Sequence, residues 1–268
     1  VGGAMFGDNL SMISDTTIAA TRTQGCEMKD KFIMNFKIAL PAAILTIIIM
    51  IFTGVSGQIP DDLGYSVIKI VPYIAVLVLA LLGINVFLVL IIGIVLGGVI
   101  GLLDGSFTLI AFTQTIYDGF TSMQEIFILS LLVGGLAALI SKEGGVDYLL
   151  NTITSRIKSV RGAEAGISAL VSVADICTAN NTVAIVITGP MAKQIADENG
   201  VDPRRSASLL DIFSCIWQGI IPYGAQLLLA GQLSQLSPIE IMPSLYYPYL
   251  LAIVAILAII FGFPKAKA

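Results

Sequence analysis

The stretch VSVADICTANNTVAIVITG (residues 171–189) sets a polar run, residues 180–182, between two apolar arms. Asp175 lies in the first arm, among alanine, valine and isoleucine. At membrane depth, non-helical backbone is tolerated only where it is buried in protein or lines a cavity. The stretch therefore predicts two helical arms that meet at a polar tip within a membrane protein.

The composition of the whole chain supports this environment. Of 268 residues, 56% are apolar and 12% are charged, whereas a soluble domain carries about 25% charged residues. The chain has no histidine, which excludes His-ligated metal or haem and His-based acid–base catalysis. Its three cysteines form no disulfide framework. We expect an all-α polytopic membrane protein that binds no nucleic acid and has the lipid bilayer as its partner.

Five apolar stretches are candidate continuous spans: residues 36–54, 67–82, 84–103, 126–140 and 245–263. Two further apolar regions are interrupted like the first, at FGDNLSMISDTT (residues 6–17) and WQGIIPYGAQ (residues 217–226). These regions predict broken transmembrane helices. In the third continuous span, Gly93, Gly97 and Gly101 form a smooth face suited to close helix packing or to a homodimer.

The basic residues predict how the chain is oriented. All of them except Lys69 fall within residues 22–37, 142–161, 193–205 and 265–267. By the positive-inside rule these segments are cytoplasmic, which puts the C-terminus inside the cell at the inner (plasma) membrane. Residues 163–199 then enter and leave on one side, so they form a re-entrant helical hairpin.

The order of elements predicts an inverted repeat. Residues 67–268 contain three spans, the hairpin, a broken span (residues 206–230) and a last span (residues 245–263), which together make one complete repeat. Residues 1–54 contain a broken helix and one span, which match the end of such a unit. Residues 6–10 align with residues 223–227 at an offset of 217. Because five crossings invert the following copy, we expect an inverted-repeat transporter whose first repeat begins upstream of Val1.

Ionisable groups at membrane depth are costly, at about 2.5 to 3.5 kcal/mol each on insertion scales, so each suggests a functional site. Every ionisable group expected at membrane depth is acidic, and no lysine or arginine is expected there. A site of carboxylate, amide and hydroxyl oxygens suits a hard cation such as Na⁺. The candidates are Asp8, Asp15, Asp175 and Asp211.

Each candidate has a structural alternative, except Asp175, which lies where no helix cap is needed. Asp8 and Asp15 could cap helices. Asp211 lies within reach of Arg205 and could form an ion pair with it. Asn180 and its neighbours could serve the turn of the hairpin.

Three stretches give the chain a family resemblance: GAMFGDNLSMISDTTIAATRTQG (residues 3–25), ADICTANNTVAIVITGPMAKQIA (residues 174–196) and GIIPYGAQ (residues 219–226). The chain resembles the NhaC-type Na⁺/H⁺ antiporters of the ion transporter superfamily. The resemblance implies inverted repeats whose hairpins and broken helices meet near the midplane, and exchange of Na⁺ for H⁺ without a cofactor. It implies a cation site drawn from Asp8, Asn9, Ser14, Asp15, Thr16, Asp175, Asn180, Asn181 and Thr182, with Asp8, Asp175 and Asn180 as candidate Na⁺ ligands.

The leading hypothesis is therefore Na⁺/H⁺ antiport, in which the two cations compete for the same carboxylates. Similar proteins also exchange lactate and malate, so a Na⁺- or H⁺-coupled carrier of a small carboxylate remains an alternative. A further alternative is that the chain is a regulatory half of a transporter, without transport activity of its own. We expect no enzyme, because the glycine-flanked motif of intramembrane aspartyl proteases would need glycine where this chain has Met5.

Overall fold

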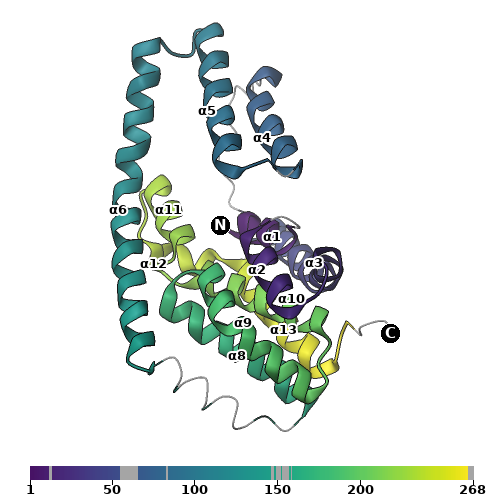
Figure 1. Cartoon of the computed structure of the whole chain (residues 1–268). Coiled ribbons are helices and arrows are strands. Elements are labelled where there is room, and N and C mark those ends of the chain that lie inside the picture. The colour runs from purple at the N-terminus through teal and green to yellow at the C-terminus, as the bar shows by residue number, and fades with distance from the viewer. Residues whose placement is uncertain are drawn as a thin grey trace. The chain divides into compact units, whose positions relative to one another are not determined.

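The computed structural model describes residues 1–11, 14–54, 66–82, 84–145, 148, 152, 157 and 159–264 (Figure 1). In these ranges the regular elements are all helical. The chain forms two compact units. The first comprises Val1–Gly54 and Ile128–Ala268, and the second comprises Val55–Phe127. Helix α6 (Leu109–Lys142) belongs partly to each.

The first unit contains all the candidate site residues. Its helices, with the part of α6 that it includes, are α1 (Gly2–Asn9), α2 (Asp15–Gln24), α3 (Met28–Thr53), α8 (Val160–Thr178), α9 (Asn181–Asn199), α10 (Pro203–Ile220), α11 (Ala225–Ser234), the short α12 (Pro238–Ile241) and η2 (Met242–Ser244), and α13 (Tyr246–Phe261). Helices α1 and α2, and likewise α10 and α11, are separated within the two regions where interruptions were expected, while a broken helix within a membrane stays a prediction.

Helix α10 lies at the centre of the first unit. It contacts α1, α2, α3, α8, α9 and α13, and from Arg205 to Gly219 every residue except Trp217 is buried. Its aliphatic residues join the main hydrophobic core with those of α3, α8 and α13. Polar residues on the same helix are enclosed along with them, so α10 carries polar groups into the interior of the unit.

Helices α8 and α9 form the expected hairpin, and only two residues separate them. Helix α8 ends where Ala179 takes a left-handed backbone conformation (φ 49°), and its N–H donates to the carbonyl of Asp175. Asn180 then caps α9, because its side-chain oxygen accepts from the N–H of Val183 at 2.9 Å. The helical hairpin is thus present in the chain, while its re-entrant position in a membrane stays a prediction.

The internal alignment at an offset of 217 is not reflected in the helix boundaries. Residues 6–9 are helical in α1, whereas residues 223 and 224 lie in the break between α10 and α11. Gly224 is the N-cap of α11, while the aligned Gly7 lies within a helix. The inverted repeat stays a prediction that rests on the order of elements and the charge pattern.

Among the described residues, two helical segments are long and apolar enough to cross a membrane, Met28–Thr53 and Pro203–Ser234. A third is counted if Pro238–Ser244 and Tyr246–Phe261, which are bent by 56°, make one span. The expected spans 67–82 and 84–103 correspond to shorter apolar helices. The expected span 126–140 is part of α6.

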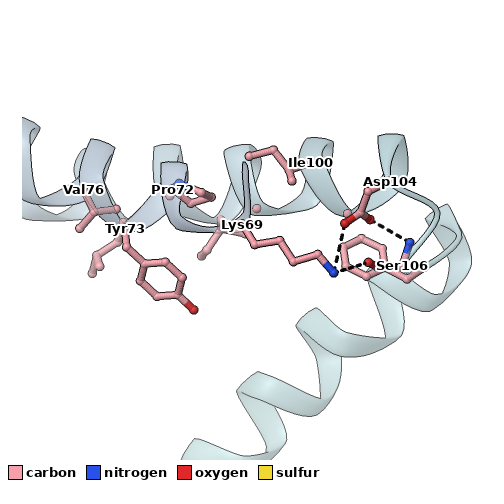
Figure 2. Close-up of a pocket in the computed structure, with 13 residues that line it drawn as sticks. Lys69, Pro72, Tyr73, Val76, Ile100, Asp104 and Ser106 are labelled. Atoms are coloured by element: carbon pink, nitrogen blue, oxygen red, sulfur yellow. Dashed lines mark hydrogen bonds and ion pairs between the residues drawn. The ribbon is translucent and has the colours of Figure 1, made fainter. Parts of the chain in front are cut away.

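The second unit contains η1 (Val67–Ile70), α4 (Val71–Leu81) and α5 (Val86–Leu103). A largely apolar pocket of about 590 Å³ lies between them (Figure 2). At its end Lys69 binds Asp104 at 3.2 Å and Ser106 at 3.0 Å. A Cβ added to Gly93 would come within 2.6 Å of Val76, so this glycine permits α4 and α5 to pack closely within the chain.

Candidate functional site

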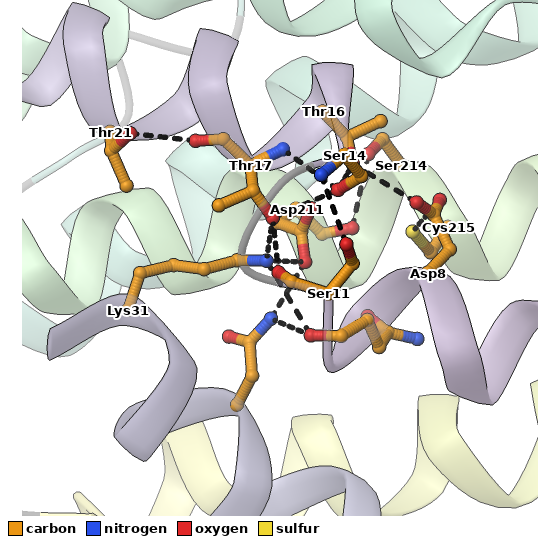
Figure 3. A network of polar contacts seen from close by, with 12 residues as sticks. Asp8, Ser11, Ser14, Thr16, Thr17, Thr21, Lys31, Asp211, Ser214 and Cys215 are labelled. Carbon is orange, nitrogen blue, oxygen red and sulfur yellow. Dashed lines mark hydrogen bonds and ion pairs between the residues drawn. The ribbon is translucent and has the colours of Figure 1, made fainter. Parts of the chain in front are cut away.

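The carboxylate of Asp8 is the point where four segments of the first unit meet, and Figure 3 shows it with Thr16 and Cys215. It lies in the last turn of α1 and is half-buried. Its Oδ1 accepts from the Thr16 hydroxyl of α2 at 3.3 Å. Its Oδ2 accepts from the Asn181 amide of α9 at 3.2 Å and from the Cys215 thiol of α10 at 3.2 Å. We call these four residues the Asp8 cluster.

A second contact joins the hairpin to the first motif. The Thr182 hydroxyl donates to Oδ2 of Asp15 at 2.6 Å, while the N–H of Thr16 donates to Oδ1 of the same carboxylate at 3.0 Å. Asp15 itself is exposed, at the start of α2. The N-terminal end of α9 therefore binds both acidic residues of the first motif.

Asn180 and Ser14 serve as helix caps in the structure. The Asn180 side chain binds the backbone of its own helix, and its neighbour Asn181 makes the contact with Asp8. Ser14 is the N-cap of α2, where its oxygen accepts from the N–H of Thr17 at 3.3 Å. The Ser14 hydroxyl also lies 3.0 Å from that of Thr16, so it remains next to the Asp8 cluster.

A lysine stands beside these acidic residues, which corrects the expectation of a site without a base. Lys31 of α3 and Asp211 of α10 have no exposed side-chain surface, and Nζ lies 2.7 Å from Oδ2 (Figure 3). Nζ also donates to the Thr17 hydroxyl at 2.7 Å and to the Asn9 carbonyl at 3.4 Å. The charge rule had placed Lys31 in a cytoplasmic loop, whereas the structure places it inside a helix bundle.

Two asparagines complete this buried network. The Asn35 amide donates to Oδ2 of Asp211 at 2.6 Å and to the Asn9 carbonyl at 2.9 Å. The Asn9 amide donates to the carbonyl of Met5 at 3.1 Å and to the Tyr247 hydroxyl at 3.4 Å. Within the described part of the chain, Oδ1 of Asn9, Asn35 and Asp211 is in each case buried without a hydrogen-bond partner. The network thus leaves three buried acceptor oxygens without a donor.

Asp175 lies apart from both groups. It is fully buried in α8, and neither of its carboxylate oxygens has a hydrogen-bond partner among the described residues. On the facing helix α10, the Gln218 amide binds the carbonyl of Ala179 at the hairpin turn at 3.3 Å. A buried polar group without a partner is costly, so Asp175 sits where a proton or a cation would relieve that cost.

The alternative ion pair of Asp211 with Arg205 does not form. Arg205 instead binds Glu164 of α8 at 3.0 Å, and this pair is almost wholly buried. The partner of Asp211 is Lys31, which comes from α3. Asp211 therefore does form an ion pair, but its partner is Lys31 of α3 and not Arg205 of its own helix.

Sequence reasoning missed Lys31, Asn35 and Cys215, and the spacing of residues could have found them. Lys31 and Asn35 are four residues apart, which puts them on one face of α3. On α10, Asp211, Cys215 and Gln218 follow at intervals of four and three, and these residues contact Lys31, Asp8 and Ala179 respectively. A polar stripe along an otherwise apolar helix was the available signal.

The Asp8 cluster contains mainly oxygen donors. Within the described ranges no group of three or more His, Cys, Asp or Glu residues could hold a metal ion. The Asp8 cluster instead offers one carboxylate, one hydroxyl and one amide, together with a thiol. Few charges and several neutral oxygens suit a small cation of low charge better than a transition metal, which prefers nitrogen and sulfur ligands.

Comparison with known proteins identifies the family of the chain. Residues 63–263 match the model of the Na⁺/H⁺ antiporter family. The chain is 19% identical over 297 residues to the malate-2H⁺/Na⁺-lactate antiporter of Bacillus subtilis (strain 168). This alignment covers 98% of the chain but 63% of that relative, so the chain spans less than two thirds of its length. No solved structure matches the chain. The family model covers most of the chain, and the chain therefore belongs to the Na⁺/H⁺ antiporter family.

Proposed function

We propose that the protein exchanges Na⁺ for H⁺ across the plasma membrane, with its C-terminus in the cytoplasm, and that the two cations compete for Asp8 and Asp175. Family membership points to a membrane-embedded transporter rather than to an enzyme, and the resemblance to a Na⁺-lactate antiporter supports sodium-coupled antiport. Secondary transporters bind their ions at broken helices and hairpin tips, which is where these two residues lie.

The observation that carries the proposal is the position of the Asp8 carboxylate. It lies one residue from the end of α1 and accepts hydrogen bonds from α2, from the tip of the hairpin and from α10. Because three separate helices donate hydrogen bonds to this carboxylate, a proton or a cation that binds it would change all three contacts. Neutral donors hold it in this structure, so its negative charge is available to a cation.

Competition follows from the limited number of oxygens. A proton bound to Asp8 neutralises the charge that would attract Na⁺, and a bound Na⁺ excludes the proton. The Thr16 hydroxyl, which donates to Asp8, also has oxygen lone pairs that a cation at this carboxylate would use. Because only one of the two cations occupies the carboxylate, alternating access carries Na⁺ in one direction and H⁺ in the other.

The test is exchange activity in everted membrane vesicles, in which a pH-sensitive dye reports H⁺ movement when NaCl is added. Asp8→Asn and Asp175→Asn are each expected to abolish the Na⁺-dependent signal. The matched control is Asp118→Asn, because Asp118 is exposed on α6, where Gln114 of the same helix donates to it. Wild-type exchange in both D8N and D175N would refute the assignment.

A graded variant pair tests the ligand role of Thr16. Thr16→Val removes the hydroxyl that binds Asp8, and we expect the Na⁺ concentration for half-maximal exchange to rise about tenfold. Thr16→Ser keeps the hydroxyl and is expected to stay near the wild-type value. Equal values for T16V and T16S would contradict a role of the hydroxyl in Na⁺ binding.

A second candidate function is coupled exchange of a small carboxylate, which is favoured by the relative named for malate and lactate. The same vesicles separate the two functions. If the H⁺ signal with NaCl requires lactate or malate on one side of the membrane, the carboxylate exchanger is correct. If the signal is complete without an organic anion, Na⁺/H⁺ exchange is correct.

A further inference from the structure

The environment of the Lys31 side chain is that of a bound cation. Its ammonium group has three N–H donors, and three oxygens surround it: Oδ2 of Asp211 at 2.7 Å, the Thr17 hydroxyl at 2.7 Å and the Asn9 carbonyl at 3.4 Å. These oxygens come from α10, α2 and the end of α1, and the side chains of Lys31 and Asp211 have no exposed surface. The set contains a carboxylate, a hydroxyl and a backbone carbonyl, which are oxygen ligands that a hard cation accepts.

The surrounding oxygens exceed what Lys31 needs. Oδ1 of Asp211 is buried and has no hydrogen-bond partner in the described part of the chain, and the same is true of Oδ1 of Asn9 and Asn35. The first belongs to the carboxylate that binds Lys31, and the two asparagines belong to the same hydrogen-bonded network. Unsatisfied buried oxygens are rare in native proteins and call for an explanation. A site whose ligands were arranged for a coordinated ion would contain them.

We propose that the side chain of Lys31 permanently occupies a second monovalent-cation site, built by Asp211, Thr17 and Asn9, and that Na⁺ enters this site when the ammonium group is removed. Both occupants carry a single positive charge, so either neutralises the buried Asp211. An uncompensated charge at that depth is strongly destabilising, so the site needs a cation or a proton.

Hydroxyl groups connect the second site to the Asp8 cluster. Ser14 lies between them, with its hydroxyl 2.9 Å from that of Thr17 and 3.0 Å from that of Thr16, which binds Asp8. The two sites thus lie side by side along the start of α2. The consequence for transport rests on the proposed function: with the second site closed by its own lysine, Na⁺ is carried at Asp8 and Asp175 and not at Asp211.

The variant Lys31→Met tests the second site directly in the purified protein. We would measure thermal unfolding in NaCl and in choline chloride at equal ionic strength and at about pH 9, because a proton also neutralises a buried carboxylate. The readout is the Na⁺-dependent rise in melting temperature of K31M minus that of the wild type. The same difference is also measured with Asp8→Asn in both proteins, which removes the carboxylate of the Asp8 cluster, so the result stands even if the proposed function fails.

We expect the rise for K31M to exceed that of the wild type by about 4 °C at a Na⁺ concentration about ten times the Kd. The matched control is K31M/D211N, in which the charge that needs a cation is absent, and its rise should return to the wild-type value. Equal rises in K31M and the wild type would overturn the proposal, as would an excess that persists in K31M/D211N.

Failure to fold is also informative. If K31M cannot be recovered folded in NaCl while K31M/D211N can, Na⁺ does not replace the ammonium group and the proposal is overturned. If neither protein folds, Lys31→Gln replaces Lys31→Met in the same comparison, because its amide still offers donors to Thr17 and Asp211 without a charge. Equal rises in K31Q and the wild type, or an excess that persists in K31Q/D211N, would then overturn the proposal.

Discussion

The buried ion pair between Glu164 and Arg205 gives the most direct test of how the central helix is held. Their side chains are 11% and 4% exposed, and Nη2 of Arg205 lies 3.0 Å from Oε2 of Glu164. The other terminal nitrogen, Nη1, is buried without a hydrogen-bond partner within the described ranges. Glu164 is therefore the group that neutralises Arg205 at the contact of α10 with α8.

We predict that Glu164→Met lowers the free energy of unfolding by about 3 to 5 kcal/mol, because it leaves the Arg205 charge buried and uncompensated. At about 2 to 4 °C per kcal/mol, the melting temperature should fall by roughly 10 °C. Arg205→Met alone should also destabilise. The double variant E164M/R205M should lie within about 1 kcal/mol of the wild type, because no buried charge remains.

The assay is thermal or denaturant unfolding of the detergent-purified protein, arranged as a double-mutant cycle. An exposed pair supplies the control: Lys193 and Asp197 lie 3.7 Å apart on α9, so Asp197→Asn should change the stability by less than about 0.5 kcal/mol. The reasoning is refuted if E164M costs less than about 1 kcal/mol. It is also refuted if the double variant is destabilised by the sum of the two single effects.

Two further predictions concern helix contacts. Gly189→Val should destabilise the protein by about 1 to 3 kcal/mol, because a Cβ there would come within 2.6 Å of Thr23, whereas Gly3→Ala, with no atom within 4 Å, should be neutral in the same melts. Asp202 caps α10, and its ion pair with Arg204 lowers the pKa of its carboxyl. That pair stabilises the fold above the ordinary aspartate pKa and loses its effect as pH falls through the lowered value. Asp202→Asn should therefore cost at most about 1 kcal/mol near neutral pH, and its stability should converge with that of the wild type in acid. A constant difference across the pH range would contradict the assignment.

The helices themselves followed from the sequence, because apolar composition and polar interruptions act locally. The hairpin was expected at residues 163–199, and the structure has its arms at Val160–Thr178 and Asn181–Asn199. Two helices start earlier than expected: the span expected from residue 126 is part of α6, which begins at Leu109, and the span expected from residue 36 is part of α3, which begins at Met28. Lysines in that first part were interpreted as loop charges, although Lys31 faces the interior.

The pairings within the site could not be predicted in the same way. The positive-inside rule places Lys31 in a solvated loop on the basis of its charge alone. Only the fold shows that Asp211, 180 residues later, neutralises this charge inside the protein. The choice between Asn180 and Asn181 is of the same kind. Both are polar residues at a turn, and only the left-handed conformation of Ala179 decides that the first caps α9 and the second reaches Asp8.

The parallel contact of α2 with α9 has a mechanical consequence. At the start of the two helices Thr182 binds Asp15, and at the other end of α2 the Gln24 amide binds the carbonyl of Gly189 at 2.9 Å. At this second point Gly189 also lets Thr23 approach closely. Because α2 is bound to α9 at both of its ends, these contacts oppose a tilt of one helix against the other. A rearrangement that preserves these contacts therefore moves α2 and the second arm of the hairpin together, as one body.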